Sequence, residues 1–391
     1  MTEFWEAVAA GDATPDNWSI ERILSQSEED HHRALVRSND AIVGETKETY
    51  IYGAGQNGRR LRSLLSKRGL NPVGFIDDTP HLQGTSVDGL AVFTLDVLKT
   101  ATPATLVVVS MFSPSHSFLR TKSRLEKFNC RTVPLHTALL ICGAEALPFN
   151  FLDTPRHYFR ARASLLALRD RLVDRSALER LWRFLVFAIT FDEKYFPVFD
   201  TERFHNVATT NRTIFVDGGA FDGDTIRTFR AACSDRFECI HAFEPDQSNF
   251  VRLSEYVNAL PTGLKERIRL YNLGLWQNAD ELSYVSTGSP ASRLSQSGTN
   301  RIRVCALDDI CLETGRYMVK LDVEGAEEQA VLGMRRLIRD QSPYMEVAVY
   351  HKPSDLYRLP ELILSLNDRY RFDFRAFGYD GADMMLCAAV E

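Results

Sequence analysis

Residues 214–225 read Ile-Phe-Val-Asp-Gly-Gly-Ala-Phe-Asp-Gly-Asp-Thr: an apolar run ends in Asp217 and passes through three glycines to an expected helix start. The next apolar run, from Cys239 to Phe243, ends in Glu244. A glycine loop after one strand and an acid after the following strand are typical of α/β units that bind nucleotides. Together the two runs predict a site for an adenosine-containing cofactor.

The chain has 391 residues, which is too long for one ordinary domain, so we expect two. Hydrophobic residues make up 45% and charged residues 25%, as in an average soluble globular protein. The formal net charge of −6 argues against a surface that binds nucleic acid in general. We therefore expect no nucleic-acid partner.

The seven cysteines are scattered and include no Cys-x-x-Cys pair, which argues against a disulfide framework and a zinc knuckle. No apolar run is long enough to cross a bilayer, and the N-terminus lacks the apolar core of a secretory signal. A cytoplasmic protein without an integral membrane segment is the expectation. The oligomeric state stays open.

Residues 1–45 are expected to form a helical N-terminal segment with two short helices, followed by a polar run from Ser25 to Asp30. His31 and His32 come next and do not indicate a metal site. Adjacent residues on a helix point about 100° apart, and no third ligand is near.

Residues 46–150 are predicted to form a first Rossmann-like domain. A strand at Thr49–Tyr52 leads through a Gly-x-Gly-x-x-Gly loop into a helix, and the next strand, Pro72–Ile76, ends in an acid. Such a loop can bring a phosphate close to backbone N–H groups, and such an acid can hold a ribose hydroxyl. The unit is either a second nucleotide site or a scaffold whose site is empty. Its candidate residues are Gly53, Gly55, Gly58 and Asp77.

The same region carries the pattern Tyr-Gly-Ala-Gly, Gly-Phe-Ile-Asp-Asp and Gly-Leu-Ala-Val. From Thr49 to Leu140 it resembles the nucleotide-sugar-binding N-terminal domain of PglD-type sugar acetyltransferases. The resemblance implies a nucleotide sugar as a ligand of this domain.

Residues 151–210 are predicted to be a helical connector. The stretch from Pro155 to Phe191 is rich in arginine, and its leucines recur at helical spacing. This pattern is typical of an amphipathic helix with a solvated charged face. The alternative is a platform for an anionic substrate.

Residues 211–391 alternate strands and helices, which predicts an open doubly wound sheet whose ligand crevice lies at the carboxyl ends of the strands. The polar stretch between Asn278 and Arg303 is expected to be an inserted loop that shapes the acceptor pocket. Within it, Arg293 is either a residue that grips the acceptor or a plain surface residue. The strands are expected near 214–216, 239–243, 268–272, 318–321 and 345–350, with a late antiparallel pair near 371–377 and 384–389. The predicted fold class is thus α/β, with two Rossmann-like doubly wound domains joined by the helical connector.

The C-terminal glycine loop has the spacing Asp-x-Gly-x-x-x-Gly, from Asp217 through Gly219 to Gly223. S-adenosylmethionine has no phosphate and presents an ammonium, a carboxylate and a sulfonium. An acid at the loop entrance suits the positive groups, and small glycines let the methionine part lie against the backbone. Glu244 can accept hydrogen bonds from both ribose hydroxyls. We therefore expect S-adenosylmethionine as the cofactor.

Six segments between residues 213 and 390 resemble the FkbM family of S-adenosylmethionine-dependent methyltransferases. They are Asp-Gly-Gly-Ala-Phe-Asp-Gly-Asp-Thr, Phe-Glu-Pro-Asp, Asn-Leu-Gly-Leu-Trp, Ala-Leu-Asp-Asp, Lys-Leu-Asp-Val-Glu-Gly-Ala-Glu and Val-Tyr-His-Lys-Pro. Gly218 departs from the family, which often has a larger residue there. The resemblance implies a class I methyltransferase fold and the methylation of hydroxyl groups, often on sugars or polyketide-type products. The cofactor-binding candidates are Asp217, Gly219, Phe221, Gly223, Asp224, Thr225, Glu244, Pro245, Asp246, Gly274 and Trp276.

Asp322 is the candidate proton acceptor or acceptor-orienting residue, because it ends a predicted strand at the expected crevice. His351 is the rival base, and Lys352 is its candidate electrostatic partner. In the alternative interpretation, Asp322 only holds the cofactor and Glu327 only caps the following helix. The carboxylates could also bind a divalent ion, but their order offers no evident ligand set, so no metal is predicted.

The predicted function is transfer of a methyl group from S-adenosylmethionine to a hydroxyl of a sugar, glycan or nucleotide-linked sugar. One alternative is a nicotinamide-dependent sugar oxidoreductase, although no Tyr-x-x-x-Lys pair supports hydride chemistry. Another is a non-catalytic nucleotide-sugar-binding partner of glycan assembly.

Overall fold

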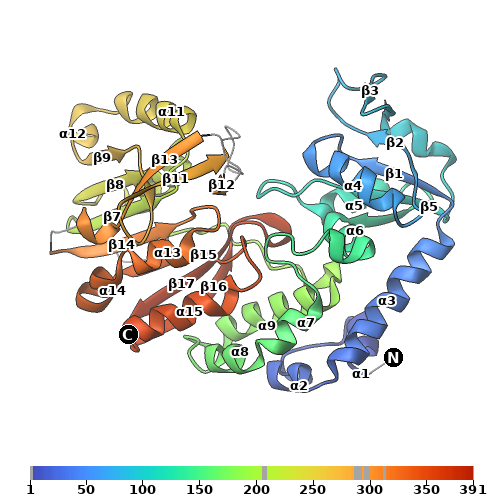
Figure 1. Ribbon diagram of the computed structural model, residues 1–391, viewed down its shortest axis with the longest axis horizontal. Coiled ribbons are helices and arrows are strands. Elements are labelled where there is room, and N and C mark those ends of the chain that lie inside the picture. The colour runs from blue at the N-terminus through green and yellow to red at the C-terminus, as the bar shows by residue number, and fades with distance from the viewer. Residues whose placement is uncertain (1–2, 205–208, 286–292, 295–299, 311–313, 391) are drawn as a thin grey trace. The chain divides into compact units, whose positions relative to one another are not determined.

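The computed structural model describes residues 3–204, 209–285, 293–294, 300–310 and 314–390, and divides the chain into two compact units. Each unit combines a largely parallel sheet with helices (Figure 1), which confirms the predicted α/β class. The first unit comprises Met1–Leu166, Leu178–Phe199 and Gly378–Asp383. The second comprises Ala167–Ala177, Asp200–Phe377 and Met384–Glu391.

The first unit begins with three helices: the two expected short helices and a third, longer one that was not predicted. They are α1 (Glu3–Ala10), α2 (Ile20–Leu24) and α3 (Glu28–Glu45). The polar run from Ser25 to Asp30 contains the start of α3, because Ser27 Oγ accepts a hydrogen bond from Asp30 N and three acidic residues occupy the first turn. Acidic residues there stabilise the positive end of a helix. His31 is buried within this segment and accepts a hydrogen bond from Trp5 Nε1 at 3.0 Å.

The sheet of the first unit has the order β3-β4-β2-β1-β5-β6. All its neighbours pair in parallel except β3 with β4. Every residue of β5 is buried, as the run Thr-Leu-Val-Val-Val predicts for a central strand. The strands are β1 (Glu48–Tyr52), β2 (Pro72–Ile76), β3 (Ser86–Val87), β4 (Leu90–Phe93), β5 (Thr105–Val109) and β6 (Arg131–Pro134). The later helices are α4 (Gln56–Ser66), α5 (Phe118–Leu125), α6 (Leu135–Cys142), α7 (Pro155–Arg160), α8 (Arg162–Arg169) and α9 (Arg175–Thr190), the last two of which also contribute residues to the second unit.

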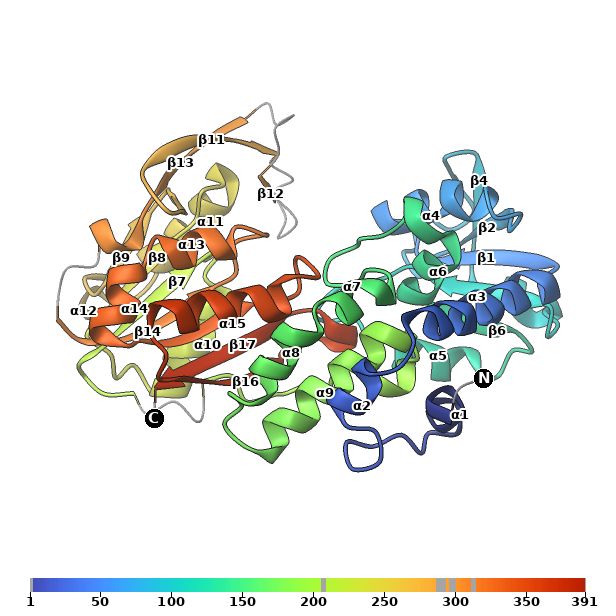
Figure 2. The ribbon, with the colours of Figure 1, turned by 60° about the horizontal axis from the view of Figure 1, so that its bottom comes forward.

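The second unit contains a seven-stranded sheet of order β16-β17-β15-β14-β7-β8-β9. Its first five strands in chain order are parallel. The predicted late antiparallel pair is β16 with β17, and β17 also pairs antiparallel with β15. The helices α13 and α15 pack side by side against this sheet (Figures 1 and 2). The strands are β7 (Thr213–Gly218), β8 (Cys239–Phe243), β9 (Ile268–Tyr271), β14 (Arg316–Leu321), β15 (Tyr344–Ala348), β16 (Tyr370–Ala376) and β17 (Met384–Val390). The helices are α10 (Asp224–Cys233), α11 (Gln247–Asn258), α12 (Thr262–Lys265), α13 (Glu327–Leu332), α14 (Arg335–Gln341) and α15 (Asp355–Leu366).

A small sheet of order β10-β13-β11-β12 occupies much of the stretch that was expected to be a loop. Its strands are β10 (Gly274–Leu275), β11 (Asp280–Val285), β12 (Arg293–Leu294) and β13 (Asn300–Cys305). Apolar and polar residues alternate in β13, as in a strand with one solvated face. The backbone of Arg293 belongs to β12, and its side chain lies outside the described part of the chain.

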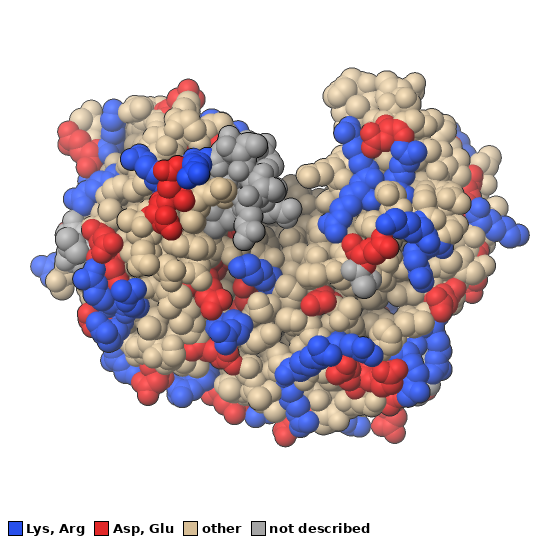
Figure 3. Space-filling model, viewed as in Figure 1, with Lys and Arg blue, Asp and Glu red and all other residues tan. Residues whose placement is uncertain are grey.

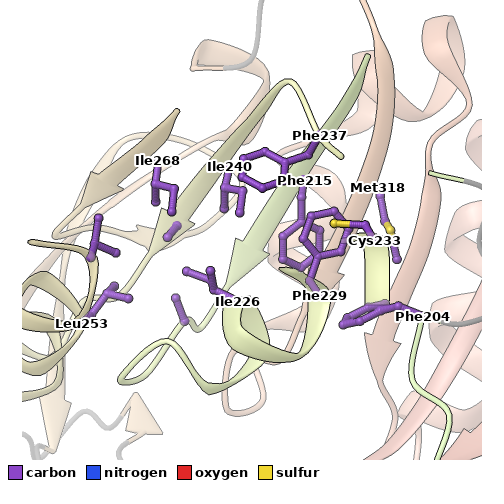
Figure 4. Close-up of a cluster of buried hydrophobic side chains, with 13 residues drawn as sticks. Phe204, Phe215, Ile226, Phe229, Cys233, Phe237, Ile240, Leu253, Ile268 and Met318 are labelled. Carbon is purple, nitrogen blue, oxygen red and sulfur yellow. The ribbon is translucent and has the colours of Figure 1, made fainter. Parts of the chain in front are cut away.

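Aromatic side chains form much of the core beside β7 (Figure 4). Phe215 of β7 and Phe229 of α10 stack with ring centroids 4.1 Å apart and an interplanar angle of 15°. Phe204 packs edge-on against both rings. This packing anchors α10, and with it the loop that precedes α10, on the central strand.

Basic and acidic side chains are interspersed on the face shown in Figure 3. In the described ranges, no helix combines the length and apolar character needed to cross a membrane.

Candidate active site

The middle of the seven-stranded sheet is where the chain changes direction. From β7 the chain moves outward through β8 to β9, and it then returns to β14 on the other side of β7. Such a reversal opens a crevice at the carboxyl ends of the strands. The register aligns Asp217 with Lys320, and it aligns Gly218 with Leu321 on one side and Phe243 on the other. The glycine loop after β7 and the acidic motif after β14 therefore start side by side.

Two glycines determine the shape of the loop after β7. Gly219 has a φ of +78°, and a Cβ atom there would lie 1.9 Å from the carbonyl oxygen of Asp322. Gly223 has a φ of +90° at the N-cap of α10, and a Cβ atom there would lie 2.6 Å from Tyr256. Glycine meets both demands because it has no Cβ atom. The loop can consequently run directly against the end of β14.

The other loop candidates lie at the start of α10. Phe221 has a φ of +48°, and its N–H donates to Glu244 Oε2 at 2.9 Å. The guanidinium of Arg252 lies over the Phe221 ring, 4.8 Å from its centroid. Asp224 is the first residue of α10 and accepts a hydrogen bond from Thr225 N at 2.7 Å. The loop is thus tied to the acid that follows β8.

Glu244 is only 5% exposed, and each of its two oxygens accepts a hydrogen bond from a backbone N–H group. In addition to the bond from Phe221, Oε1 accepts from Asp246 N at 2.9 Å. Burial raises the pKa of Glu244 to about 7, although these N–H groups favour the charged form. A carboxylate has lone pairs left for further donors such as hydroxyls. Asp246 has a separate local contact, because its Oδ1 accepts from Ser248 N and Asn249 N and caps α11.

Asp217 and Lys320 form a buried ion pair, with Lys320 Nζ 3.1 Å from Asp217 Oδ1. Lys320 also donates to the carbonyl oxygen of Gly219 at 2.8 Å. Burial raises the pKa of Asp217 to about 6, and Lys320 opposes that rise. Burial lowers the pKa of Lys320, but the charges of Asp217 and Asp322 outweigh burial and raise it. Among the described residues, neither oxygen of Asp217 accepts a hydrogen bond, so this carboxylate can still take a charged donor.

Gly274 and Trp276 belong to the small sheet and its continuation. A Cβ atom on Gly274 would lie 3.7 Å from Pro245 Cβ, so β10 passes beside the end of β8. The Trp276 ring packs against Ile302 and Val304. Gly274 therefore lies beside the segment that contains Glu244, while Trp276 packs within the small sheet.

Three carboxylates surround His351 beyond the end of β14. His351 Nδ1 lies 2.9 Å from Glu327 Oε1, and its Nε2 lies 3.4 Å from Glu324 Oε2 and 3.6 Å from Asp322 Oδ1. Tyr350 donates its hydroxyl hydrogen to Asp322 Oδ1 at 3.0 Å. The His351 side chain is 8% exposed, whereas those of Asp322 and Glu324 are 21% and 30% exposed. The cluster is therefore accessible from its carboxylate side.

The charged groups in this cluster shift one another's pKa values. Burial lowers the pKa of His351, but the charge of Glu327 and the nearby carboxylates of Glu324 and Asp322 raise it well above its ordinary value. Burial raises the pKa of Asp322, but Lys320 and His351 outweigh it, so the net direction is down. Burial raises the pKa of Glu324.

Lys352 has its own local partners. Its Nζ donates to the carbonyl oxygen of Gly325, and its N–H donates to Asp355 Oδ2 at 2.9 Å. The lysine that acts most strongly on Asp322 is Lys320. Sequence reasoning did not select Lys320, although residues two apart along a strand share a face, and that spacing links Lys320 to Asp322.

Residues 217–376, which include the glycine loop and the carboxylate cluster, match the family model described as the Methyltransferase FkbM domain. These residues form an FkbM methyltransferase domain. The FkbM domain and its fold imply the use of S-adenosylmethionine.

The crystal structure of Methyltransferase FkbM from Methylobacillus flagellatus KT shares the fold, with a TM-score of 0.72 and 20% identity. The match covers 93% of this chain and 100% of that chain, so the shared fold extends well beyond the FkbM domain. An rRNA methylase from Streptococcus thermophilus matches with a TM-score of 0.32 and 13% identity, over 49% of this chain and 98% of that chain. No curated protein matches the chain.

Outside the FkbM domain, the first unit has the predicted glycine loop between β1 and α4. A Cβ atom on Gly58 would lie 2.0 Å from the carbonyl oxygen of Gly53, so the loop packs closely on itself. Asp77 accepts hydrogen bonds from Ala54 N at 2.8 Å and Thr79 N at 2.9 Å. Gly55 is the N-cap of α4, which has no side-chain cap.

Proposed function

We propose that this chain is an S-adenosylmethionine-dependent O-methyltransferase that acts on a hydroxyl group of a sugar, glycan or nucleotide-linked sugar. The observation that carries the proposal is the register of β7 with β14 and β8. It brings the glycine loop, the buried carboxylates of Asp217 and Glu244, and the partly exposed carboxylate of Asp322 to one edge of the sheet. Ligands of doubly wound sheets bind at that edge, at the point of chain reversal.

The residues present suit this cofactor. Asp217 has two buried oxygens without hydrogen bonds, which fits an ammonium donor. Glu244 fits the ribose hydroxyls, and the glycines leave room for the methionine part against the backbone. The cofactor supplies a methyl group already activated by its sulfonium. The protein must then align the acceptor oxygen and accept its proton.

Asp322 is our candidate for the residue that accepts this proton. Its side chain is more exposed than that of His351, and only its Oδ1 is engaged by Tyr350. His351 already directs Nδ1 to Glu327 and is more enclosed. We therefore assign acceptor orientation and proton acceptance to Asp322, with His351 in a supporting position.

A second ligand site at Gly53, Gly55, Gly58 and Asp77 is part of the proposal, for a nucleotide-linked acceptor. The N-terminus of α4 supports it, because it has no side-chain cap and N–H groups at a helix start favour a phosphate. The side chain of Asp77 is already engaged by the loop, so the backbone rather than this acid would carry most of the binding.

Isothermal titration calorimetry with S-adenosylmethionine tests the cofactor site. We expect one site per chain, with affinity reduced roughly 10-fold or more in Asp217→Asn and in Glu244→Gln, since each loses a charged hydrogen-bond acceptor. Asp340→Asn is the matched control, because Asp340 is an exposed carboxylate on α14. Absence of binding by the native chain would overturn the proposed function.

The acceptor is tested by incubating the chain with labelled cofactor and a panel of nucleotide sugars and cell-extract glycans. Mass spectrometry should show an added methyl group on a hydroxyl. Methylation of nitrogen or carbon instead would contradict the O-methyltransferase assignment.

A further inference from the structure

One ring nitrogen in the carboxylate cluster has no hydrogen bond. His351 Nε2 is buried and makes no hydrogen bond among the described residues, and the His351 side chain is 8% exposed. The nitrogen faces Glu324 Oε2 and Asp322 Oδ1 at 3.4 Å and 3.6 Å. A buried polar atom without a hydrogen bond is costly, so this nitrogen is suited to bind a ligand.

The distances are those between neighbouring ligands of a metal ion. One atom from each of Asp322, Glu324 and His351 lies within 4.8 Å of the other two. With metal–ligand bonds of about 2.1 Å, adjacent ligand atoms are about 3.0 Å apart in an octahedral site and about 3.4 Å apart in a tetrahedral site. We propose that Asp322, Glu324 and His351 bind a divalent metal ion.

Glu327 contacts the ring nitrogen of His351 that faces away from the proposed ion. Its Oε1 receives His351 Nδ1 at 2.9 Å, and the N–H groups of Val323 and Gly325 donate to the same oxygen at 3.0 Å and 3.3 Å. A carboxylate on the far nitrogen fixes the ring and its tautomer, as in many histidine-ligated metal sites. Glu327 is thereby a positioning residue that leaves Nε2 directed at the ion.

The backbone also holds Glu324 in place for binding. Glu324 has a φ of +55°, a left-handed conformation that non-glycine residues seldom adopt and that is found most often at functional sites. At this turn the backbone changes direction, and the Glu324 carboxylate lies 3.4 Å from His351 Nε2. Because Asp322 and Glu324 are partly exposed, water or a hydroxyl can complete the coordination.

Two carboxylate oxygens and one imidazole nitrogen suit a first-row divalent ion better than Ca²⁺, which takes oxygen ligands only. We therefore use Mn²⁺ as the probe. The role of the ion rests on the proposed function: a coordinated acceptor hydroxyl breaks its O–H bond, the proton passes to Asp322 Oδ2, and the electron pair stays on the oxygen. Binding of the ion itself does not depend on that function.

The test is titration of the full chain with Mn²⁺ after dialysis against a chelator, with free Mn²⁺ followed by electron paramagnetic resonance. We expect one equivalent to bind, with affinity reduced at least 10-fold in Glu324→Gln. Glu328→Gln is the matched control and should bind as the native chain does, since Glu328 is a neighbouring, 43% exposed carboxylate outside the cluster. Circular dichroism melting checks that both variants are folded.

The alternative occupant of the cluster is a protonated His351 paired with the carboxylates. It predicts no stoichiometric binding of Mn²⁺, Zn²⁺ or Mg²⁺ by the native chain, and that result would overturn the proposal, as would equal binding by the two variants. No cofactor or acceptor is present in this titration. Failure of metal binding therefore counts against this site alone, whereas failure of S-adenosylmethionine binding counts against the proposed transfer alone.

Discussion

Two buried carboxylates lie at the strand ends of the second unit, where burial opposes their charge. Asp217 and Glu244 are both almost fully enclosed at the strand ends. Asp217 has Lys320 as an ion-pair partner, whereas Glu244 is held by neutral N–H groups. Removing a carboxylate from water favours its protonated form, and an opposite charge or N–H donors offset part of that cost. Glu244 should consequently respond to pH more strongly than an ordinary glutamate.

Replacing Glu244 with Gln should therefore become progressively more favourable to stability as pH rises. The pKa of Glu244 is raised from its ordinary 4.5 to about 7 in the folded chain. The folded state thus holds the proton more tightly, and the native chain loses stability as pH rises from about 4.5 through about 7. One pKa unit corresponds to about 1.36 kcal/mol. As pH rises through this range, the free energy of unfolding of Glu244→Gln should therefore increase by up to about 3 kcal/mol relative to that of the native chain.

Urea unfolding of both chains at pH 5 and pH 8 measures this difference. Parallel pH dependence of the two unfolding free energies would contradict it.

The loop between β7 and α10 shows how one element depends on another. Its glycines were selected from their spacing, but the demand on Gly219 comes from the carbonyl of Asp322, about 100 residues later in the chain. The loop and the end of β14 touch because the sheet places them as neighbours. Because Gly219 has no Cβ atom, the glycine loop can contact the acidic motif that follows β14.

Gly219→Ala should destabilise the chain by about 2 kcal/mol or more, because its φ is positive and its new Cβ would collide with backbone. Gly263→Ala in α12 is the control, since nothing lies within 4 Å of a Cβ atom there. We expect that control to be neutral or slightly stabilising. Thermal unfolding of the two variants decides the matter, and equal melting temperatures would contradict the expected strain.

The small sheet is an element that the polar composition of its segment did not predict. Its strands β10 and β12 have two residues each, and its polar residues resemble those of a loop. Strands so short carry no detectable alternation, so only their pairing with β11 and β13 identifies them.

The chain forms two compact units, and each unit contains segments that are far apart in the sequence. The first unit includes Leu178–Phe199 and Gly378–Asp383, and the second includes Ala167–Ala177. Within the first unit, Trp182 Nε1 donates to the carbonyl oxygen of Trp18 at 2.5 Å, and Phe187 packs edge-on against His136. The division at residues 150 and 210 remains a prediction from the sequence.

Removing residues 1–150 should therefore expose apolar residues of α9 rather than release an intact C-terminal protein. Phe184 and Phe187 are fully buried, and deletion would take away His136 and Trp18, which contact α9. Exposed apolar surface of this kind promotes aggregation. Light scattering should show large particles, in contrast to the full chain. A monodisperse fragment that melts cooperatively would contradict this expectation.

Along the chain, the sequence alone predicted the seven strands of the large sheet of the second unit, the glycine loop and the acids at the strand ends. These features are local: apolar runs, glycine spacing and the residue that ends each run are all readable along the chain. The tertiary structure decided which of these residues meet. Asp322 and Glu324 are near His351 only because β14 and β15 are adjacent in the sheet, and Lys320 pairs with Asp217 through the register of β14 with β7. Contacts between residues far apart in the chain depend on packing and register, which a linear pattern does not encode.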